Sequence, residues 1–274
     1  MREDVTAVCR DVSCDRCRRK NSVNVRLPVG IRRQPSDSSC GATCLHAVYE
    51  YFGVSVPLQR LVDEVPELPA GGTLAVTLAL HALRRGFSAE LCTYNLQVFD
   101  PTWFRPGVDL AEKLRAQRAA KRSRKLRDAT DQYLEFLELG GIIHAQELTP
   151  ALLRRFLKRD LPVLTGLSST YLYQSARELE DGGIDDVAGG PVGHFVVLHG
   201  YHADRREVHV ADPWHPNPMS PDPNYWVDIQ RLLNSILLGI VTYDANLLVL
   251  EPKRGPAPPK PATSGASNKR KRDT

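Results

Sequence analysis

The stretch QPSDSSCGATCLHAVYEYFG, residues 34–53, places a cysteine, Cys40, at the start of an expected helix. Polar residues of the types that begin helices occupy positions 36–39, and apolar residues follow from Leu45 at helical spacing. Gly53 marks the end of this helix. A cysteine at such a position is a buried structural thiol, half of a metal or disulfide pair, or a nucleophile. The partners that decide between these must come from the rest of the chain.

The elements expected elsewhere indicate the fold class. Further helices are expected at 57–65, at 73–85, as a pair over 109–139, from 149 onward and at 224–238. Strands are expected at 90–94, 162–167 and 246–252, with a β-hairpin over 193–212 that turns at 203–206. Helices that precede a largely antiparallel set of strands are typical of an α+β fold rather than an alternating βαβ sheet.

The 274-residue chain is long enough for one large domain. We predict an irregular N-terminal extension over 1–28 and a single domain over 29–252. Within that domain, a basic helical insertion is expected at about 100–145 and a polar, glycine-rich loop at 177–192. The basic tail, 253–274, is rich in proline, lysine and serine and is expected to be disordered.

The composition, 42% hydrophobic and 25% charged, is that of an ordinary soluble protein. The longest apolar runs, at 161–167 and 236–241, are too short to span a bilayer, and the N-terminus lacks the apolar segment of a secretory signal. A cytoplasmic location with reduced thiols is therefore expected. The net charge of +4 argues against a dedicated nucleic-acid binder, although cations are dense in 113–127.

Six cysteines raise the question of metal or disulfide pairing: Cys9, Cys14, Cys17, Cys40, Cys44 and Cys92. The first three form C-x4-C-x2-C, but no second pair with zinc-ligand spacing follows. A loose extension is therefore favoured over a structural zinc site. Cys44 lies one helical turn after Cys40 and is interpreted as a small buried apolar residue.

A nucleophilic cysteine must become a thiolate, and the position of Cys40 favours this. The unpaired N–H groups at a helix N-terminus stabilise a negative charge there. Gly41 is expected to leave room for a substrate to approach the sulfur. Gln34 provides a side-chain amide which, with the backbone N–H of Cys40, is a candidate donor to the oxyanion that forms on attack.

The base that a cysteine nucleophile requires is expected to be His194. It follows a glycine-rich loop at the start of the hairpin's first strand, and Asp212 lies at the end of the second. In an antiparallel hairpin the start of one strand lies beside the end of the next, so the two residues are expected to be neighbours. His199 faces the opposite side of a regular strand and His202 lies toward its far end, which makes both poorer candidates.

Three motifs occur in order: Q-x5-C-G-x2-C-L from Gln34, G-H-F-V-V-L-x-G-Y around His194, and V-x-D-P-W around Asp212. Together they resemble the C39 and C39-like cysteine peptidases, papain-like α+β proteins best known as the leader-peptide-cleaving domains of peptide exporters. The resemblance implies that Cys40 is the nucleophile and Gln34 an oxyanion donor. It also implies that His194 is the general base and acid and that Asp212 orients it.

The resemblance covers the segments 30–95 and 160–250. Ser39 stands where the family usually has an aspartate before the nucleophile, a departure that lies outside the triad. The basic insertion is not part of the compact exporter-type domain, and no transporter segments follow. We therefore expect a stand-alone member, to which cleavage after a double glycine is not carried over.

The predicted function is hydrolysis of a peptide bond by a Cys-His-Asp triad, without a metal or organic cofactor. The substrate is expected to be a peptide or protein, and the basic residues of 113–127 suggest an acidic one. Two alternatives stay open: acyl or peptidyl transfer with the same triad, and a peptide-binding module without turnover. Trp214 is expected either to wall the cleft beside His194 or to lie in the core.

Overall fold

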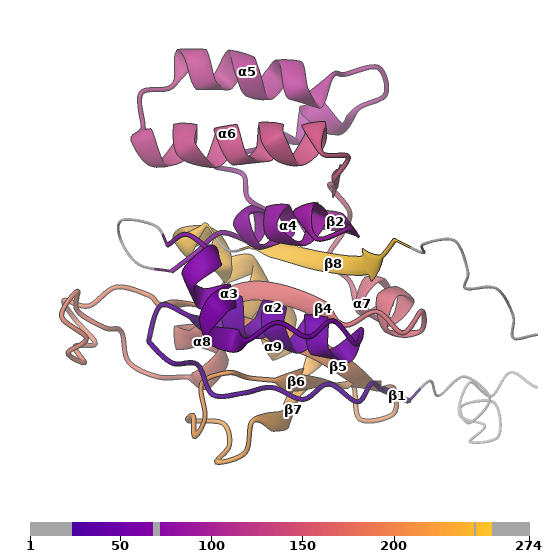
Figure 1. Ribbon diagram of the computed structural model, residues 1–274. Coiled ribbons are helices and arrows are strands. Elements are labelled where there is room, and N and C mark those ends of the chain that lie inside the picture. The colour runs from indigo at the N-terminus through magenta and orange to yellow at the C-terminus, as the bar shows by residue number, and fades with distance from the viewer. Residues whose placement is uncertain (1–23, 68–71, 244, 254–274) are drawn as a thin grey trace, which may run out of the picture.

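The computed structural model describes residues 24–67, 72–243 and 245–253. Within them, eight strands form one mostly antiparallel sheet: β1 (Val25–Arg26), β2 (Phe87–Thr93), β3 (Ile142–His144), β4 (Val163–Ser168), β5 (Gly193–His202), β6 (Glu207–Ala211), β7 (Asn224–Asp228) and β8 (Asn246–Pro252). The strand order is β3-β2-β8-β4-β5-β6-β7, and β1 pairs with β5 (Figure 1).

Helices cover the sheet and also extend beyond it: α2 (Cys40–Tyr51), α3 (Leu58–Glu64), α4 (Ala75–Arg84), α5 (Leu110–Ala120), α6 (Arg124–Glu138), α7 (Pro150–Leu157), α8 (Ser169–Tyr173) and α9 (Ile229–Leu238), with the 3-10 turns η1 (Pro101–Phe104) and η2 (Gly239–Thr242). In Figure 1, α5 and α6 form a hairpin above α4, apart from the sheet. The α+β class with a helical insertion is confirmed. None of the helices in the described part of the chain combines the length and the apolar character that crossing a membrane requires.

The hairpin that carries two of the candidate site residues forms as the sequence predicts. A turn at 203–206 joins β5 and β6, and Val197 pairs with Ala211. His194 is the second residue of β5, and Asp212 directly follows β6. Both residues therefore lie at the same end of the hairpin, because antiparallel strands run in opposite directions.

The segment 224–238 differs from the single helix that its sequence predicts. Its first part is strand β7, in which Tyr225 and Val227 are buried and their neighbours are more exposed, a period of two. The side chain of Asp228 then accepts hydrogen bonds from the backbone N–H groups two and three residues further on, and α9 begins. The prediction was wrong because it placed Asp228 inside a helix rather than at its N-cap.

The sheet begins earlier in the chain than the predicted domain boundary at residue 29. Val25–Arg26 forms β1 against β5, and Leu27 is buried beside it. Residues 1–23 of the predicted extension, with the cysteine cluster at 9–17, lie outside the described residues, as does the tail beyond 253.

Gly41 lies where α2 closely approaches two other elements. A Cβ atom at this position would lie 2.5 Å from Thr73 Cγ2, 3.2 Å from Leu78 Cδ1 and 3.4 Å from Phe195 Cδ2. The space beside the glycine is therefore filled by the start of α4 and by β5. The expectation that Gly41 leaves room for a substrate is wrong; the missing side chain instead lets α2 pack tightly.

A Gly41→Ala substitution is expected to lower the free energy of unfolding by about 1 kcal/mol. Overpacking a tight contact costs roughly 1–3 kcal/mol, or about 2 kcal/mol at mid-range, and the gain in helix propensity offsets up to about 1 kcal/mol of it. Urea unfolding measures the change. Adding Thr73→Ser removes only the opposing methyl group and is expected to restore most of the loss. A Gly41→Ala protein as stable as the wild type contradicts this account of the contact.

Candidate active site

Cys40 is the first residue of α2 and has 6% of its surface exposed. Ser39 occupies the N-cap, but its hydroxyl does not cap the helix; it donates to Ser36 O at 2.8 Å and accepts from Ser36 N at 2.9 Å. The first turn of α2 also holds no acidic residue. Among the described residues, the N–H groups at this helix start therefore have no side-chain cap, and they favour a negative charge next to them.

His194 links Cys40 to Asp212. Its Nε2 lies 2.8 Å from Asp212 Oδ1, and Cys40 lies close enough to its imidazole to influence its pKa. Burial lowers the pKa of His194, but the charge of Asp212, the hydrogen bond to Asp212 and the interaction with Cys40 outweigh burial and raise it above its ordinary value. A positively charged imidazole next to a sulfur stabilises a thiolate.

Asp212 is fully buried, and four donors surround its carboxylate. Oδ1 accepts from His194 Nε2 and, at 3.0 Å, from the backbone N–H of Trp214. Oδ2 accepts from the hydroxyls of Tyr173 and Tyr225, both at 2.7 Å. Burial raises the pKa of Asp212, but the charge of His194 and these hydrogen bonds lower it below its ordinary value. The carboxylate is therefore ionised and held in one orientation.

Sequence reasoning did not identify Tyr173 and Tyr225, here named the tyrosine clamp. Tyr173 ends α8, a five-residue helix too short to show a periodic pattern. Tyr225 lies in β7 and pairs with Val210 of β6. Val210 precedes Asp212 by two residues, so Tyr225 and Asp212 lie on the same face of the sheet. The placing of Tyr225 and Val227 two residues apart, between polar Asn224 and Asp228, is the sequence signal that indicates a strand here; the contact with Asp212 depends on the register with β6.

Gln34 lies in the loop that leads to Cys40. Its backbone N–H donates to Pro213 O at 2.9 Å, which joins this loop to the residue after Asp212. Its side-chain Nε2 donates to Ser36 O at 3.0 Å and lies 3.5 Å from the carbonyl oxygen of Asp37. The structure thus brings Gln34 to the same region as the other three predicted site residues, with its amide directed into its own loop.

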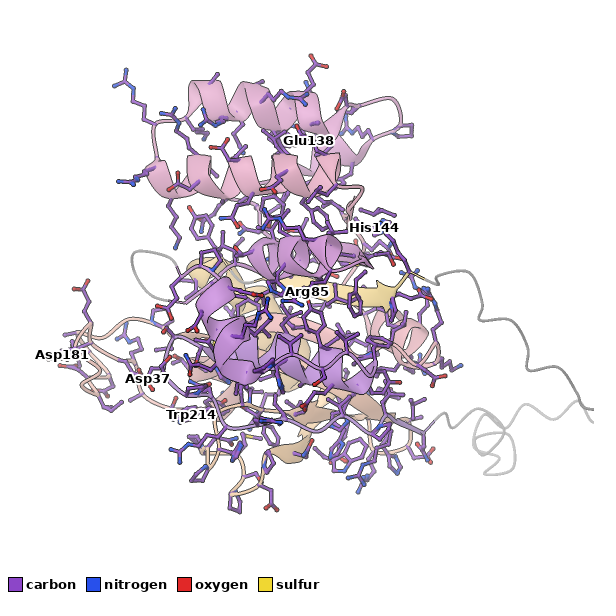
Figure 2. All side chains as sticks on the ribbon, in the orientation of Figure 1. Asp37, Arg85, Glu138, His144, Asp181 and Trp214 are labelled. Carbon is purple, nitrogen blue, oxygen red and sulfur yellow. The ribbon has the colours of Figure 1, made fainter. Side chains whose placement is uncertain are left out.

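Trp214 lies on the side of the imidazole rather than in the core. Its ring meets that of His194 edge-on at a centroid distance of 6.4 Å and that of Tyr173 at 5.2 Å. It remains 37% exposed. In Figure 2, Trp214 and Asp37 are labelled on the same side of the molecule, where the hydrogen bond from Gln34 joins their two loops. Of the two expectations for Trp214, the wall beside His194 fits the structure.

The other described cysteines are structural in character. Cys44 is fully buried, donates its thiol hydrogen to Phe195 O at 3.2 Å, and has a pKa that burial raises well above its ordinary value. Burial raises the pKa of Cys92 to about 11. The interpretation of Cys44 as a small buried residue is confirmed.

The neighbouring histidines have different surroundings from His194. The Nδ1 atom of His199 lies 2.8 Å from Leu27 O, and its ring is tilted against that of His209 at a centroid distance of 4.4 Å. His209 in turn stacks on Trp226. Across residues 24–67, 72–243 and 245–253, no group of three histidine, cysteine or acidic side chains is placed to hold a metal ion.

An α+β domain in which a helix start presents a cysteine to a buried histidine–aspartate pair has the arrangement that cysteine hydrolases use. Residues 26–230 match the Peptidase_C39 like family, so the chain belongs to this family. A comparison with curated protein sequences finds no match.

Several solved structures are similar to this chain. A C39-like peptidase from Bacillus anthracis is 15% identical, with 85% of this chain and all of that chain covered and a TM-score of 0.40. Xylellain, a cysteine protease from Xylella fastidiosa, is 17% identical over 84% of this chain and 86% of that chain, with a TM-score of 0.42. A double glycine motif protease from an AMS/PCAT transporter, solved with its leader peptide, is 14% identical over 84% and 99%, with a TM-score of 0.41.

Proposed function

We propose that this protein is a cysteine peptidase that hydrolyses a peptide bond with Cys40 as its nucleophile. The observation that carries the proposal is the unbroken chain of contacts from Cys40 through His194 to Asp212 at the N-terminus of a helix. A structural thiol has no need of an imidazole held by a buried carboxylate. Cys44, one turn further along the same helix, bonds to a backbone carbonyl instead. Membership of the family supports the proposal.

In the proposed reaction, the thiolate of Cys40 attacks the carbonyl carbon of the substrate, and the carbonyl oxygen becomes an oxyanion. His194 gives its proton to the leaving amine as the C–N bond breaks, which leaves the acyl group on the sulfur. His194 then takes a proton from water, whose oxygen attacks the thioester. The carboxylic acid product leaves, and the thiolate is regenerated beside a protonated His194.

The oxyanion in this reaction needs donors near the sulfur. The backbone N–H of Cys40 is one, because it belongs to the uncapped first turn of α2. Gln34 Nε2 carries two N–H groups, and only one of them is used at good distance, to Ser36 O. The second faces the carbonyl oxygen of Asp37 at 3.5 Å, a long contact that a substrate oxyanion replaces at little cost.

Asp212 and the tyrosine clamp act through His194 rather than on the substrate. The carboxylate fixes which imidazole nitrogen faces Cys40 and stabilises the imidazolium. Tyr173 and Tyr225 hold the second oxygen of Asp212 from two different elements, α8 and β7. The carboxylate is therefore fixed from both sides, and we assign the two tyrosines as positioning residues.

The test of hydrolysis is a digest of a cell-extract peptide pool, read by mass spectrometry. New peptide termini are expected with the wild-type protein and with Cys44→Ala, but not with Cys40→Ala. The same termini in the Cys40→Ala digest, or none in the wild-type digest, overturn the proposal. A small primary amine added to the digest separates hydrolysis from acyl transfer, because a transferase converts the new carboxyl termini into amides.

We also propose that the α5–α6 hairpin attracts acidic segments of the substrate. Ion pairs within the hairpin neutralise part of its positive charge: Arg115–Glu138, Arg118–Asp131 and Arg124–Asp128. Lys121, Arg122 and Arg127, at and just after the turn, are exposed and form no ion pair with any described residue. In Figure 1 this turn lies on the same side of the molecule as the start of α2.

Replacing Lys121, Arg122 and Arg127 together with glutamine is expected to lower kcat/KM for acidic peptides about tenfold at low ionic strength, because long-range attraction is lost. The kcat/KM for neutral peptides is expected to stay unchanged. High salt is expected to remove the difference between wild type and variant. An equal response of acidic and neutral peptides to the substitutions or to salt counts against this role.

A further inference from the structure

The outward side of α9 and η2 is apolar, although a surface helix ordinarily presents polar side chains to solvent. Leu232 and Ile236 are fully buried and belong to the inward side of α9. Leu237, Leu238 and, in η2, Val241 are 45%, 43% and 55% exposed. Val241 follows the two leucines by four and three residues, the spacing of neighbours on one helix face. We name these three exposed side chains the α9 stripe; apolar side chains that gather on a surface in this way mark an interface.

Cations lie on one side of the α9 stripe. The Nζ atom of Lys125, in the first turn of α6, lies 4.2 Å from the centre of the Tyr243 ring. Because Tyr243 follows Val241 by two residues, this contact places the start of α6 beside the stripe. Lys121 and Arg122, in the turn between α5 and α6, are exposed and form no ion pair with any described residue. Their positive charge is therefore available to a partner.

Carboxylates approach the stripe from the loop 177–190. This loop has five acidic residues and one cation: Glu178, Glu180, Asp181, Asp185, Asp186 and Arg177. Within the part of the chain that the structure describes, none of the five carboxylates forms an ion pair. Ser175 and Pro191, which flank the loop, line the same cavity as Leu238 and Val241. The base of the loop therefore adjoins the stripe.

The acidic loop has a defined shape that presents its negative charge outward. Glu178 and Gly190 close it by exchanging backbone hydrogen bonds at 3.1 and 2.8 Å. The guanidinium of Arg177 donates to the carbonyl oxygens of Asp186 and Val187, so the one cation of the loop is used within it. The loop as a whole is therefore a negatively charged projection.

The basic turn and the acidic loop lie on the same side of the molecule. In Figure 1 the turn between α5 and α6 lies toward the top and the loop projects below it, and Figure 2 marks the loop by Asp181. A surface that is basic at one end, apolar in the middle and acidic at the other end complements a copy of itself rotated by half a turn. We propose that this protein forms a two-fold symmetric dimer through the α9 stripe, with the acidic loop of each copy against the α5–α6 turn of the other.

A second copy of the chain fits this surface better than an anionic membrane does. A membrane complements the cations and the stripe, but its negative charge repels the acidic loop, whereas a second copy complements all three parts. Three aliphatic side chains make a small apolar centre, so the dimer is expected to be weak and to depend on protein concentration. Dimerisation goes beyond the proposed peptidase activity and does not require that Cys40 be a nucleophile.

The test is sedimentation velocity of the full chain under reducing conditions, from low to high micromolar concentration. The mass is expected to rise from that of one chain toward that of two. Val241→Lys is expected to weaken dimerisation at least about tenfold, because it buries an unpaired charge in the interface. Leu139→Lys, which changes an exposed leucine at the end of α6, is the matched control and is expected to associate as the wild type does. A wild-type protein that stays monomeric, or a Val241→Lys protein that dimerises like the wild type, overturns the proposal.

Charge reversal tests how the two copies are oriented. Glu180→Lys/Asp181→Lys makes the loop less acidic, and Lys121→Glu/Arg122→Glu makes the turn acidic. Each variant alone is expected to dimerise at least about a hundredfold more weakly, because charges that attracted each other then repel. An equal mixture of the two variants is expected to recover the wild-type affinity, since the reversed loop of one then faces the reversed turn of the other.

The remaining outcomes of the charge reversal all count against the dimer. A mixture that associates no better than the separate variants overturns the two-fold arrangement, as does either variant alone dimerising like the wild type. Vesicles of phosphatidylglycerol provide the last comparison. Wild-type protein that binds them while remaining monomeric in solution assigns the α9 stripe to a membrane surface and overturns the dimer.

Discussion

Cys40 is expected to react with iodoacetamide near neutral pH about a hundredfold more slowly in a His194→Ala variant than in the wild-type protein. The thiolate is the reactive species, and the protonated imidazole beside Cys40 stabilises it. Without His194, only the helix N-terminus favours the charged sulfur. Alkylation at each cysteine is followed by peptide mapping, so the rate is assigned to one residue.

In His194→Ala, greater access to the Cys40 sulfur is expected to change the rate in the opposite direction. A slower reaction is therefore informative. Removing an imidazole opens space around a sulfur that is mostly buried, so sterics alone predict a faster reaction. A slower reaction therefore indicates that the positive charge of His194 beside Cys40 has been lost. His199→Ala removes another buried histidine from the same strand and is expected to leave the rate unchanged. Cys92, whose pKa burial raises to about 11, is expected to react slowly in all three proteins. Equal rates at Cys40 with and without His194 rule out an activated nucleophile.

The sequence predicts the parts of the site that depend on local structure. The turn at 203–206, between an apolar first strand and an alternating second one, is sufficient to bring His194 and Asp212 together, and the structure has them 2.8 Å apart. The start of α2 at Cys40 follows from its polar flank and its apolar period. These predictions succeed because hairpin register and helix boundaries are set by neighbouring residues.

The parts that the sequence does not predict depend on contacts between distant segments. Tyr173 reaches Asp212 from 39 positions away, and the short helix that presents it has no periodic signal. Gly41 appears free for substrate until Thr73 and Phe195 are seen beside it. In each case the partner lies far along the chain, and a local pattern carries no information about it.

Asp212→Asn is expected to lower kcat/KM by about 10³ to 10⁴ while leaving the fold intact. Asparagine fills the same volume, but it carries no negative charge to stabilise the imidazolium, and its NH2 group replaces one of two oxygens that both accept hydrogen bonds here. The pH dependence of kcat/KM in the Asp212→Asn variant also tests the role of the Asp212 charge. Activity is lost at high pH as His194 loses its proton, and the charge of Asp212 raises the pKa of His194. Without that charge, burial lowers this pKa, so the alkaline limit of activity is expected to move to lower pH. Steady-state kinetics over a pH series, with circular dichroism to check the fold, measures both effects.

The tyrosine clamp provides the comparison that separates charge from positioning. Tyr173→Phe and Tyr225→Phe each remove one donor to Oδ2 and keep the carboxylate. Each is expected to lower kcat/KM about ten- to hundredfold, because one hydrogen bond to a charged group, roughly 1.5–3 kcal/mol, is lost while the remaining donors still hold Asp212. The alkaline limit does not move to lower pH in these variants, because fewer donors leave more negative charge facing His194. A limit that falls in Tyr225→Phe as it does in Asp212→Asn contradicts the positioning role, since the clamp would then maintain the charge of Asp212 rather than its orientation.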